Sequence, residues 1–443
     1  PLLLYLEALP NAIGISAIAV ARAIGRGCGV ALLFVIHRMG PPVVGRPATR
    51  VALALTAFYP PMALWAIGGL ETLPTALAAT GGVLLLATPG VDRPRALRAG
   101  IVLATLPWLR PEGIVIALAV AVLAEAPGLL RRTTRRTAFG HLVLAAGIPL
   151  ASQLVLEVER LALYGHLMPN SVIYKSGAGT GWAVLDKFAA QATPLLVATA
   201  VGLVFARRRQ LLLAAPPAVY ALGSLGTLDS VNAFSRFFMP TWPQCALLVG
   251  LGVAVASRGL GRLRPAVAMA AGVAVVALIV TQRDGDFDTT RAWGDSYAAC
   301  RDGARTDAAA WLRTQTIKST TFAITDAGLA PAQARRSAID QVMLNEPVIQ
   351  RTGPLSDQRR AKIVFRRNPD VLVMASRTAD RYRAYYVLDG EIAKDPRFRR
   401  YKLEHVARGA GEKCNYYLFL YQRAAQRPVI QLASQRARAL DAR

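Results

Sequence analysis

The sequence predicts a mainly α-helical membrane protein, in which a polytopic helical bundle is followed by a small α/β or α+β domain. First, 53% of the 443 residues are hydrophobic and the mean hydropathy is +0.35, although the formal net charge is +25. Second, long apolar runs give way to shorter, charged segments near residue 282. We therefore expect a transmembrane domain over 1–281, a soluble domain over 282–423 and a tail over 424–443.

The membrane domain is expected to open with a short helix over 1–9 and a first full span over 13–36. Arg22 and Arg26 lie within this span. An arginine at membrane depth usually faces the bundle interior or the lipid headgroups. A structural pairing role and a ligand-binding role are both open for these two residues.

Proline and glycine predict breaks in the next apolar runs. Pro60 and Pro61 are expected to kink a span over 50–68. The stretch 99–128 is too long for one span and predicts two helices around a tip at 110–113. The remaining spans are expected in a run that ends near residue 89 and over 139–157, 188–206, 210–226, 237–256 and 265–281.

The positive charge is explained by membrane topology, so we expect the lipid bilayer as a partner and no nucleic acid. The sequence lacks the basic stripes interleaved with aromatic residues that are typical of RNA-binding surfaces. If successive spans cross the membrane in alternate directions, five of the basic segments that link them lie on one face. We call these segments the basic links; together they contain sixteen arginines and one acidic residue, Asp92. By the positive-inside rule this face is cytoplasmic. The segments near residues 71, 112, 170 and 236, and everything after 282, then lie on the extracytoplasmic side.

Strand and helix patterns alternate after residue 282, as expected of a small α/β or α+β domain. Loops that follow strands at Thr325-Asp326-Ala327-Gly328 and from Asp340 to Pro347 fit turns as well as binding loops. We expect a helix over 306–314 and strands over 320–325, 371–375, 401–406 and 415–421.

The four cysteines show no metal-binding spacing. Cys28 and Cys245 lie in predicted spans and are expected to act as small apolar residues. Cys300 and Cys414 fall in the C-terminal domain. If that domain is outside the cytoplasm, a disulfide between them is allowed but not required.

The polar stretch 164–175 interrupts the apolar runs, and Gly165 and Pro169 prevent a continuous helix. Irregular polar backbone at membrane depth is tolerated where protein buries it or where it lines a wet cavity. The stretch is therefore either a connecting loop or one wall of a substrate cavity. His166 is its only histidine and fits a surface polar group as well as a ligand-binding residue.

Carboxylates stand at helix ends on the same predicted face, at Glu71, Glu112 and Asp229. Glu71 and Glu112 could simply cap helix N-termini, where the macrodipole favours negative charge. Capping does not require the cations that accompany them, which are Arg110, Lys175 and Arg236. Arginine suits a phosphate ligand, whereas carboxylates suit the hydroxyl groups of a sugar or the activation of one as a nucleophile. The sequence contains no P-loop, dinucleotide-binding glycine motif, HExxH motif or nucleophile elbow.

These stretches resemble polytopic GT-C glycosyltransferases, in particular actinobacterial terminal arabinofuranosyltransferases. The order and spacing of four short motifs carry the resemblance: Gly69-Leu70-Glu71-Thr72, Arg110-Pro111-Glu112-Gly113, Tyr164-Gly165 to Asn170-Ser171 followed by Lys175, and Arg236-Phe237 with Pro240. Three C-terminal runs are similar to the family's extracytoplasmic domain: Thr325 to Gly328, Ile339-Asp340 and Leu344 to Pro347.

The resemblance implies a plasma-membrane enzyme of cell wall biogenesis. Such an enzyme transfers a sugar, for example arabinofuranose, from a polyprenyl-phosphate donor to a glycan acceptor outside the cytoplasm, with inverting chemistry. It also implies that a divalent metal ion, Mg or Mn, helps to hold the donor phosphate. The residues that would line the cavity are Glu71, Arg110, Glu112, Tyr164, Asn170, Lys175 and Arg236, and their positions add His166 and Asp229 as candidate substrate-binding residues.

Two departures from the family pattern leave other functions open. The family's acidic catalytic motif lies ahead of the segment that begins at Pro1, so the general base is expected outside these 443 residues and the chain as given to be inactive. The glycine-rich acidic stretch ahead of Arg236 is altered to Leu228-Asp229-Ser230-Val231-Asn232. One alternative is a transporter or lipid flippase, which would need broken helices in two related halves. The other is a catalytically inactive scaffold for envelope assembly.

Overall fold

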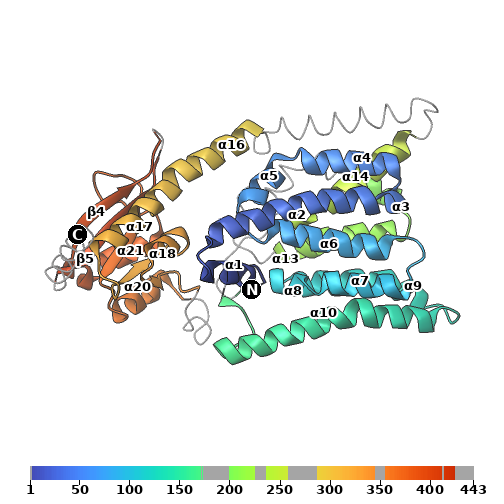
Figure 1. The fold of residues 1–443 in the computed structure, drawn as a ribbon, viewed down its shortest axis with the longest axis horizontal. Coiled ribbons are helices and arrows are strands. Elements are labelled where there is room, and N and C mark those ends of the chain that lie inside the picture. The colour runs from blue at the N-terminus through green and yellow to red at the C-terminus, as the bar shows by residue number, and fades with distance from the viewer. Residues whose placement is uncertain are drawn as a thin grey trace. The chain divides into compact units, whose positions relative to one another are not determined.

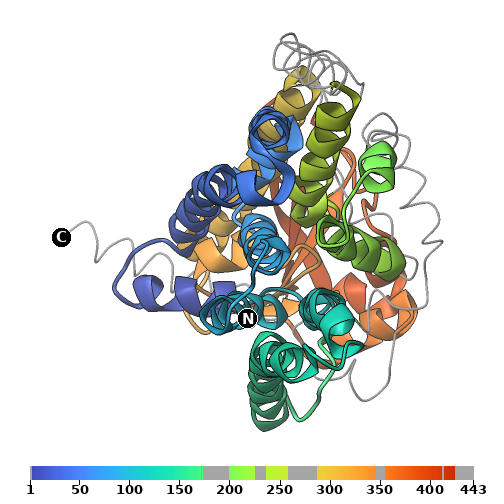
Figure 2. The same cartoon turned by 90° about the vertical axis from the view of Figure 1, so that its right-hand side faces the viewer.

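The computed structural model describes residues 2–170, 172, 199–224, 236–257, 287–344, 355–411 and 414–424. The chain divides into two compact units. The helical unit comprises residues 1–167 and 175–291, and the sheet unit comprises residues 168–174 and 292–443. Figures 1 and 2 show the bundle of the first and the strands of the second.

The helical unit contains the breaks that proline and glycine predict. The apolar run at 50–68 forms two helices, which bend by 58° at Pro60. The stretch 99–128 forms two longer helices around a short one. The described elements are α1 (Leu2–Ala12), α2 (Ala17–Met39), α3 (Pro41–Val44), α4 (Arg46–Ala57), α5 (Pro60–Ile67), α6 (Thr72–Ala87), α7 (Arg93–Leu103), α8 (Leu106–Leu109), α9 (Gly113–Leu129), α10 (Arg135–Tyr164), η1 (Gln210–Ala214), α13 (Ala215–Ser224), η4 (Met239–Thr241) and α14 (Trp242–Ala256).

Among the described residues, three helical segments are long and apolar enough to cross a membrane: α2, α10 and η4 with α14. The bent pair of α4 and α5 counts as a fourth if it forms one span. Helix α6 is buried along almost its whole length and packs against α2, α7 and α9. Figure 2, which looks along the bundle, shows the other helices around it. The predicted span 265–281 and residues 425–443 of the predicted tail lie outside the described residues.

The basic links that lie within the described part of the helical unit meet at one end of the bundle. Nη1 of Arg209 donates to the carbonyl of Thr88 at 2.8 Å, and Nε2 of Gln210 donates to the carbonyl of Val43 at 2.7 Å. Figure 1 shows the links from α6 to α7 and from α9 to α10 at this same end. We call it the basic end. The turns that precede α6 and α9 lie at the other end of the bundle, which we call the motif end.

The sheet unit contains a mixed five-stranded sheet of order β2-β1-β3-β5-β4. Strands β2, β1 and β3 run parallel, whereas β5 is antiparallel to both β3 and β4. All four expected strands and the expected helix are present. The elements are α16 (Phe287–Ser296), which spans the division between the units, the π-helical turn η6 (Tyr297–Asp302), α17 (Gly303–Gln315), β1 (Thr321–Ile324), α18 (Leu329–Ala334), β2 (Ser337–Asp340), α20 (Asp357–Arg366), β3 (Val371–Ser376), α21 (Val387–Lys394), η7 (Pro396–Arg400), β4 (Tyr401–Arg408) and β5 (Tyr417–Arg423).

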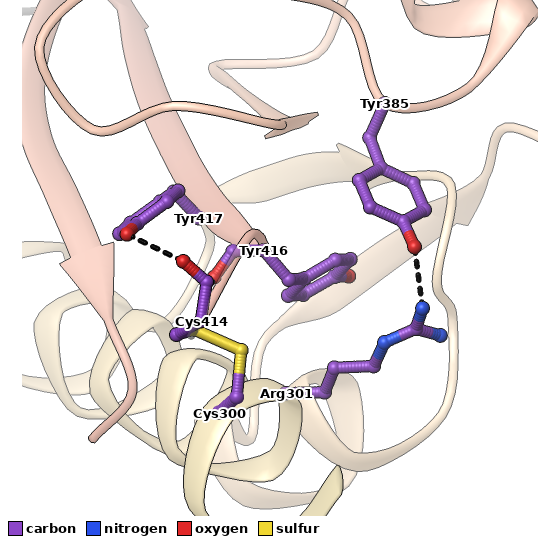
Figure 3. The surroundings of a disulfide bond; sticks show 6 residues. All are labelled: Cys300, Arg301, Tyr385, Cys414, Tyr416 and Tyr417. Atoms are coloured by element: carbon purple, nitrogen blue, oxygen red, sulfur yellow. Dashed lines mark hydrogen bonds between the residues drawn. A yellow bond between two sulfur atoms is a disulfide. The ribbon is translucent and has the colours of Figure 1, made fainter. Parts of the chain in front are cut away.

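Both faces of the sheet are covered, so the central strand β3 is buried at every position. Residues of α17 and α18 contribute to one apolar core, and residues of α20 and α21 contribute to the other. A disulfide joins Cys300 in η6 to Cys414, just before β5, with 5.3 Å between the two Cα atoms (Figure 3). The pairing that the sequence left open is therefore made in the structure.

Candidate functional site

The turn between α5 and α6 presents Glu71 at the motif end. Gly69 has a φ of +67°, a backbone conformation that favours glycine. Glu71 occupies the N-cap position of α6, but its side chain makes no capping hydrogen bond. Its Oε1 lies 3.2 Å from Nη2 of Arg236 and 3.6 Å from Nη1 of Arg110. The carboxylate is therefore held by two arginines rather than used as a helix cap.

Arg110 lies at the tip between α8 and α9, which closes tightly because residue 113 is glycine. A Cβ at Gly113 would lie 2.2 Å from the carbonyl oxygen of Leu106. The Arg110 residue is only 7% exposed, and its Nε donates to Oε1 of Glu112 at 2.6 Å. Glu112 occupies the N-cap position of α9, again without a capping hydrogen bond. Both carboxylates therefore pair with the same buried guanidinium.

Hydrogen bonds to α10 fix the helical segment that leads to this tip. Nε1 of Trp108 donates to Oγ of Ser152 at 2.8 Å, and that hydroxyl donates to the carbonyl of Ala104 at 2.7 Å. Both bonds join residues more than forty positions apart in the sequence. They hold the chain just ahead of Arg110 in one place.

Arg236 reaches the same end of the bundle from a distant part of the sequence. It precedes η4 and α14, where Nε1 of Trp242 donates to the carbonyl of Leu55 at 3.1 Å. The Trp242 ring stacks on Tyr59 with 3.6 Å between the centroids. The guanidinium of Arg236 lies 5.7 Å from the ring centre of Trp65. Packing between α14 and the bent pair of α4 and α5 therefore positions Arg236.

Aromatic rings complete the surroundings of the buried arginine. The guanidinium of Arg110 lies 5.5 Å from the ring centre of Tyr220 and 5.3 Å from that of Phe237. Such contacts attract a cation to the negative face of the ring. Tyr220 and Trp65 were not predicted, because a single aromatic residue in an apolar helix has no distinguishing pattern. Phe237 was noted only as part of the Arg236-Phe237 motif.

We define the charged cluster as Glu71, Arg110, Glu112 and Arg236. Its two carboxylates balance its two guanidinium groups. Nη1 of Arg110, Nε of Arg236 and the hydroxyl of the neighbouring Thr72 are buried, and none makes a hydrogen bond to a described residue. A buried donor left without a partner costs about 1–3 kcal/mol. The cluster can therefore offer several buried donors to the oxygen atoms of a ligand.

Of the other predicted site residues, Tyr164 and His166 make no contact with the charged cluster. Tyr164 is 60% exposed at the end of α10, which Gly165 terminates with a φ of +73°. Neither Tyr164 nor His166 makes a side-chain hydrogen bond, ion pair or ring contact with the residues that the structure describes. Asn170 belongs to the sheet unit, where its Nδ2 donates to the carbonyl of Leu344 at 2.9 Å. Lys175 and Asp229 lie outside the described residues.

The described residues do not fit a divalent metal ion. Within the described ranges, no three His, Cys, Asp or Glu side chains come close enough together to hold one. The two carboxylates of the charged cluster already pair with Arg110. We therefore assign no chemical step to a metal, and the Mg or Mn ion implied by the resemblance stays a prediction.

A separate polar group is buried in the sheet unit, next to the carboxyl ends of β1 and β3. The hydroxyl of Thr325 lies 2.6 Å from both Oε1 of Gln341 and Oδ1 of Asp389, and the backbone N–H of Ala375 donates to Oδ2 of Asp389 at 3.0 Å. One hydroxyl proton cannot serve both oxygens. One solution turns the Gln341 amide so that its Nε2, which has no hydrogen-bond partner among the described residues, donates to Thr325. The other is a protonated Asp389 that donates to Thr325. Burial raises the pKa of Asp389 to about 7, in agreement with this arrangement.

Comparison with known proteins bears mainly on the fold. A family model described as a domain of unknown function (DUF8728) matches residues 296–419, and a search of curated proteins finds no match. The oligosaccharyltransferase AglB of Archaeoglobus fulgidus, solved with an inhibitory peptide and a dolichol-phosphate, is 15% identical at a TM-score of 0.54. That alignment covers 84% of this chain and 61% of AglB, so this chain matches about three fifths of the archaeal enzyme.

ArnT of Cupriavidus metallidurans, solved with bound undecaprenyl phosphate, is 12% identical at a TM-score of 0.58. The alignment covers 95% of this chain and 87% of ArnT, and the apo structure of ArnT matches at a TM-score of 0.57. Both neighbours have the GT-C fold, and this likeness confirms the predicted fold class. The chain has the GT-C fold, a helical membrane bundle followed by a small C-terminal sheet domain.

Proposed function

We propose that the protein is a membrane glycosyltransferase that uses a polyprenyl-phosphate-linked sugar, and that the charged cluster binds the donor phosphate. The observation that carries this proposal is the convergence of Arg110 and Arg236, each with a buried donor that has no partner among the described residues. Guanidinium groups suit phosphate oxygens in geometry and charge. AglB was solved with a dolichol-phosphate and ArnT with undecaprenyl phosphate, which supports a lipid phosphate as the ligand class.

The two arginines have different tasks in this proposal. Arg110 is almost fully buried and is held by both carboxylates, so it forms the fixed part of the site. The Arg236 side chain is 24% exposed, which makes it the arginine that reaches an incoming phosphate. Glu71 is a positioning residue, because its Oε1 contacts both guanidinium groups. Helices α6 and α9 begin beside the cluster, and their N-termini also favour an anion.

These roles match the charge that develops during glycosyl transfer. The acceptor hydroxyl loses its proton to a general base and forms a bond to the anomeric carbon, and the bond from that carbon to the phosphate oxygen breaks. The leaving polyprenyl phosphate keeps the electron pair and gains negative charge. Donors fixed on that oxygen stabilise the transition state more than the ground state. Lys175, predicted for the same cavity, would supply a further positive charge.

Two independent features support the extracytoplasmic side of the plasma membrane for both the site and the sheet unit. Structural disulfides persist in oxidising compartments, and the sheet unit contains the Cys300–Cys414 bond. The charged cluster lies at the motif end of the bundle, away from the basic links. The positive-inside rule assigns those links to the cytoplasm.

Arabinofuranose as the sugar and a cell-envelope glycan as the acceptor are the finer part of the proposal. They are supported by the order of the motifs that contain Glu71, Arg110, Asn170 and Arg236. The competing functions are lipid transport and a catalytically inactive scaffold in envelope assembly. Each predicts no sugar transfer, and transport alone predicts movement of the lipid between leaflets.

Reconstitution of the full-length protein in vesicles separates these functions. Labelled polyprenyl-phosphate arabinose and mannose are offered with an oligosaccharide acceptor, and both sugar transfer and lipid movement are measured. We expect transfer that Arg110→Ala and Lys175→Ala abolish, with membrane insertion intact. Arg131→Ala, an exposed residue near the start of α10, is the matched control and should be fully active. Lipid movement without transfer would overturn the proposal.

A further inference from the structure

The sheet unit has a topological switch point between β1 and β3. From β1 the chain passes through α18 to β2 on one side, and then through α20 to β3 on the other side of β1. Because the three strands are parallel, the loops after β1 and β3 leave the same edge of the sheet. In open α/β sheets, ligands bind outside the carboxyl ends of the strands at such a point.

The loop after β1 contributes Asp326 to this edge. Its Oδ2 accepts hydrogen bonds from Nε of Arg305 and from the hydroxyl of Tyr416, both at 3.0 Å. Its Oδ1 accepts none from the residues that the structure describes, and the side chain is 26% exposed. One carboxylate oxygen therefore fixes the side chain, while the other is available to a hydroxyl group.

Arg301 contributes a cation that lies among tyrosine rings. Its guanidinium is 5.3–5.4 Å from the ring centres of Tyr297, Tyr385 and Tyr416. Nη2 donates to the hydroxyl of Tyr385 (Figure 3). No described carboxylate pairs with Arg301, whereas the neighbouring Arg305 pairs with both Asp302 and Asp326. Nε and Nη1 of Arg301 are therefore available as donors to a ligand.

The covalent structure around Arg301 holds it in place. Arg301 lies in the π-helical turn η6, and such turns are frequent at functional sites. The adjacent Cys300 is bonded to Cys414, two residues before Tyr416 (Figure 3). The backbone N–H of Ala410 also donates to the carbonyl of Ala299 at 2.8 Å. Arg301 and the Tyr416 ring are therefore preorganised by the same disulfide, as a binding site requires.

The loop after β3 supplies Tyr385 and, next to it, a further aromatic side chain, Tyr386. Tyr385 and Tyr386 precede α21 and meet edge to face, with 5.0 Å between their centroids. Both are only partly buried against the core beside η6. Their rings offer flat apolar surface beside the donors of Arg301 and the free oxygen of Asp326. Weakly positive C–H groups of a sugar ring pack favourably on such a negative ring face.

We propose that this edge is a binding site for a neutral glycan, and we name it the switch-point site. The sugar ring packs on Tyr386 beside Tyr385, while its hydroxyls donate to Oδ1 of Asp326 and accept from Arg301. Asp302 and Asp326 balance Arg301 and Arg305, and Arg377 lies 5.6 Å from the ring centre of Tyr385 as a third cation. We take the ligand as neutral because the free Oδ1 of Asp326 accepts a hydrogen bond from a hydroxyl group and repels an anion. The role of this glycan as the acceptor of sugar transfer rests on the proposed function. The binding of the glycan at this site does not depend on that function.

The test measures glycan binding by the full chain in detergent, without any lipid donor. The neutral probes are linear tetrasaccharides of arabinofuranose, mannose and glucose, and tetragalacturonate is the anionic probe. Calorimetry should show binding of at least one neutral probe. Tyr386→Leu, which keeps apolar bulk, and Arg301→Ala should each weaken that binding by about tenfold, or about 1.4 kcal/mol.

Two control variants match these changes elsewhere in the sheet unit. Arg397→Ala removes an arginine that lies 4.8 Å from the ring centre of Phe365, and Trp311→Ala removes a ring that stacks on His405. Both controls should bind glycan as the unmodified protein does, and thermal unfolding checks that every variant is folded. Absence of binding by all neutral probes, normal binding by Tyr386→Leu and Arg301→Ala, or tighter binding of tetragalacturonate would each overturn the proposal.

This outcome is independent of the proposed function. Sugar transfer that persists while no neutral glycan binds at the switch-point site rejects the site and leaves the glycosyltransferase proposal standing. Glycan binding without sugar transfer rejects the glycosyltransferase proposal and leaves the switch-point site standing.

Discussion

Arg110→Met is the most informative change in the helical unit, because it removes the buried charge and keeps most of the side-chain volume. Glu112 then loses the donor that lies 2.6 Å from its Oε1, and Glu71 keeps only Arg236. Removing one partner of a buried ion pair costs about 3–5 kcal/mol. Glu112 is 29% exposed, so water recovers part of this loss and we expect about 2–3 kcal/mol of destabilisation. For a helical unit of this size, the melting temperature should fall by about 3–5 °C.

A second substitution separates stability from function. In the double variant Arg110→Met/Glu112→Gln neither side chain is charged, so no unpaired carboxylate remains beside residue 110. Its stability should return to within about 1 kcal/mol of the unmodified protein. Sugar transfer, however, should stay at least about 100-fold below normal in both variants, because the donor to the phosphate is missing.

The assay follows thermal unfolding of the purified full-length protein and the initial rate of transfer from a polyprenyl-phosphate sugar. Recovery of transfer together with stability in the double variant would show that Arg110 only supports the fold. Normal transfer by Arg110→Met alone would equally refute its assignment to the phosphate.

Three further predictions concern the sheet unit and the topology. The folded-state pKa of Asp389, about 7 against an ordinary value of 3.8, means that the folded state holds a proton that the unfolded chain releases. The free energy of unfolding should therefore fall by about 2–4 kcal/mol as the pH rises from about 5 to 8, as measured by thermal unfolding. Asp389→Asn should abolish this fall. A flat pH profile in the unmodified protein would contradict the assignment. Cys300→Ser should lower the free energy of unfolding by up to about 4–5 kcal/mol. It should also make Cys414 reactive to maleimide without a reductant. Equal labelling of Cys414 in the unmodified protein and the variant would show that the disulfide is not formed. Reporter fusions near residues 134 and 300 should report opposite sides of the membrane, and a report of the same side would break the topology.

Local chemistry made much of the fold predictable. Pro60, Pro111 and Gly113 act on the backbone next to them, so the breaks that they cause can be located from the sequence. Strand β3 is a short apolar run with two valines, bounded by polar residues, and its predicted bounds differ from the observed ones by a single residue. Alternation of basic links and apolar runs also predicted that Glu71, Arg110 and Arg236 share one end of the bundle.

The remaining features depend on packing between distant segments. Tyr220 and Trp65 become part of the site only because α13 and α5 pack where they do. The sequence allowed the pairing of Cys300 with Cys414 but could not require it. Asp326 fits an ordinary turn after a strand until the positions of Arg305 and Tyr416 are known. Motif order can suggest a charged site, but it cannot show which donors are left without partners.

The central claim is that Arg110 and Arg236 together hold the phosphate of a lipid-linked sugar. A cryo-electron microscopy structure of the full-length protein in nanodiscs with decaprenyl phosphate tests it most directly. We expect phosphate oxygens at about 2.7–2.9 Å from Nη1 of Arg110 and from the guanidinium of Arg236. A phosphate bound instead beside Arg207 to Arg209 at the basic end, or out of reach of both arginines, would contradict the claim.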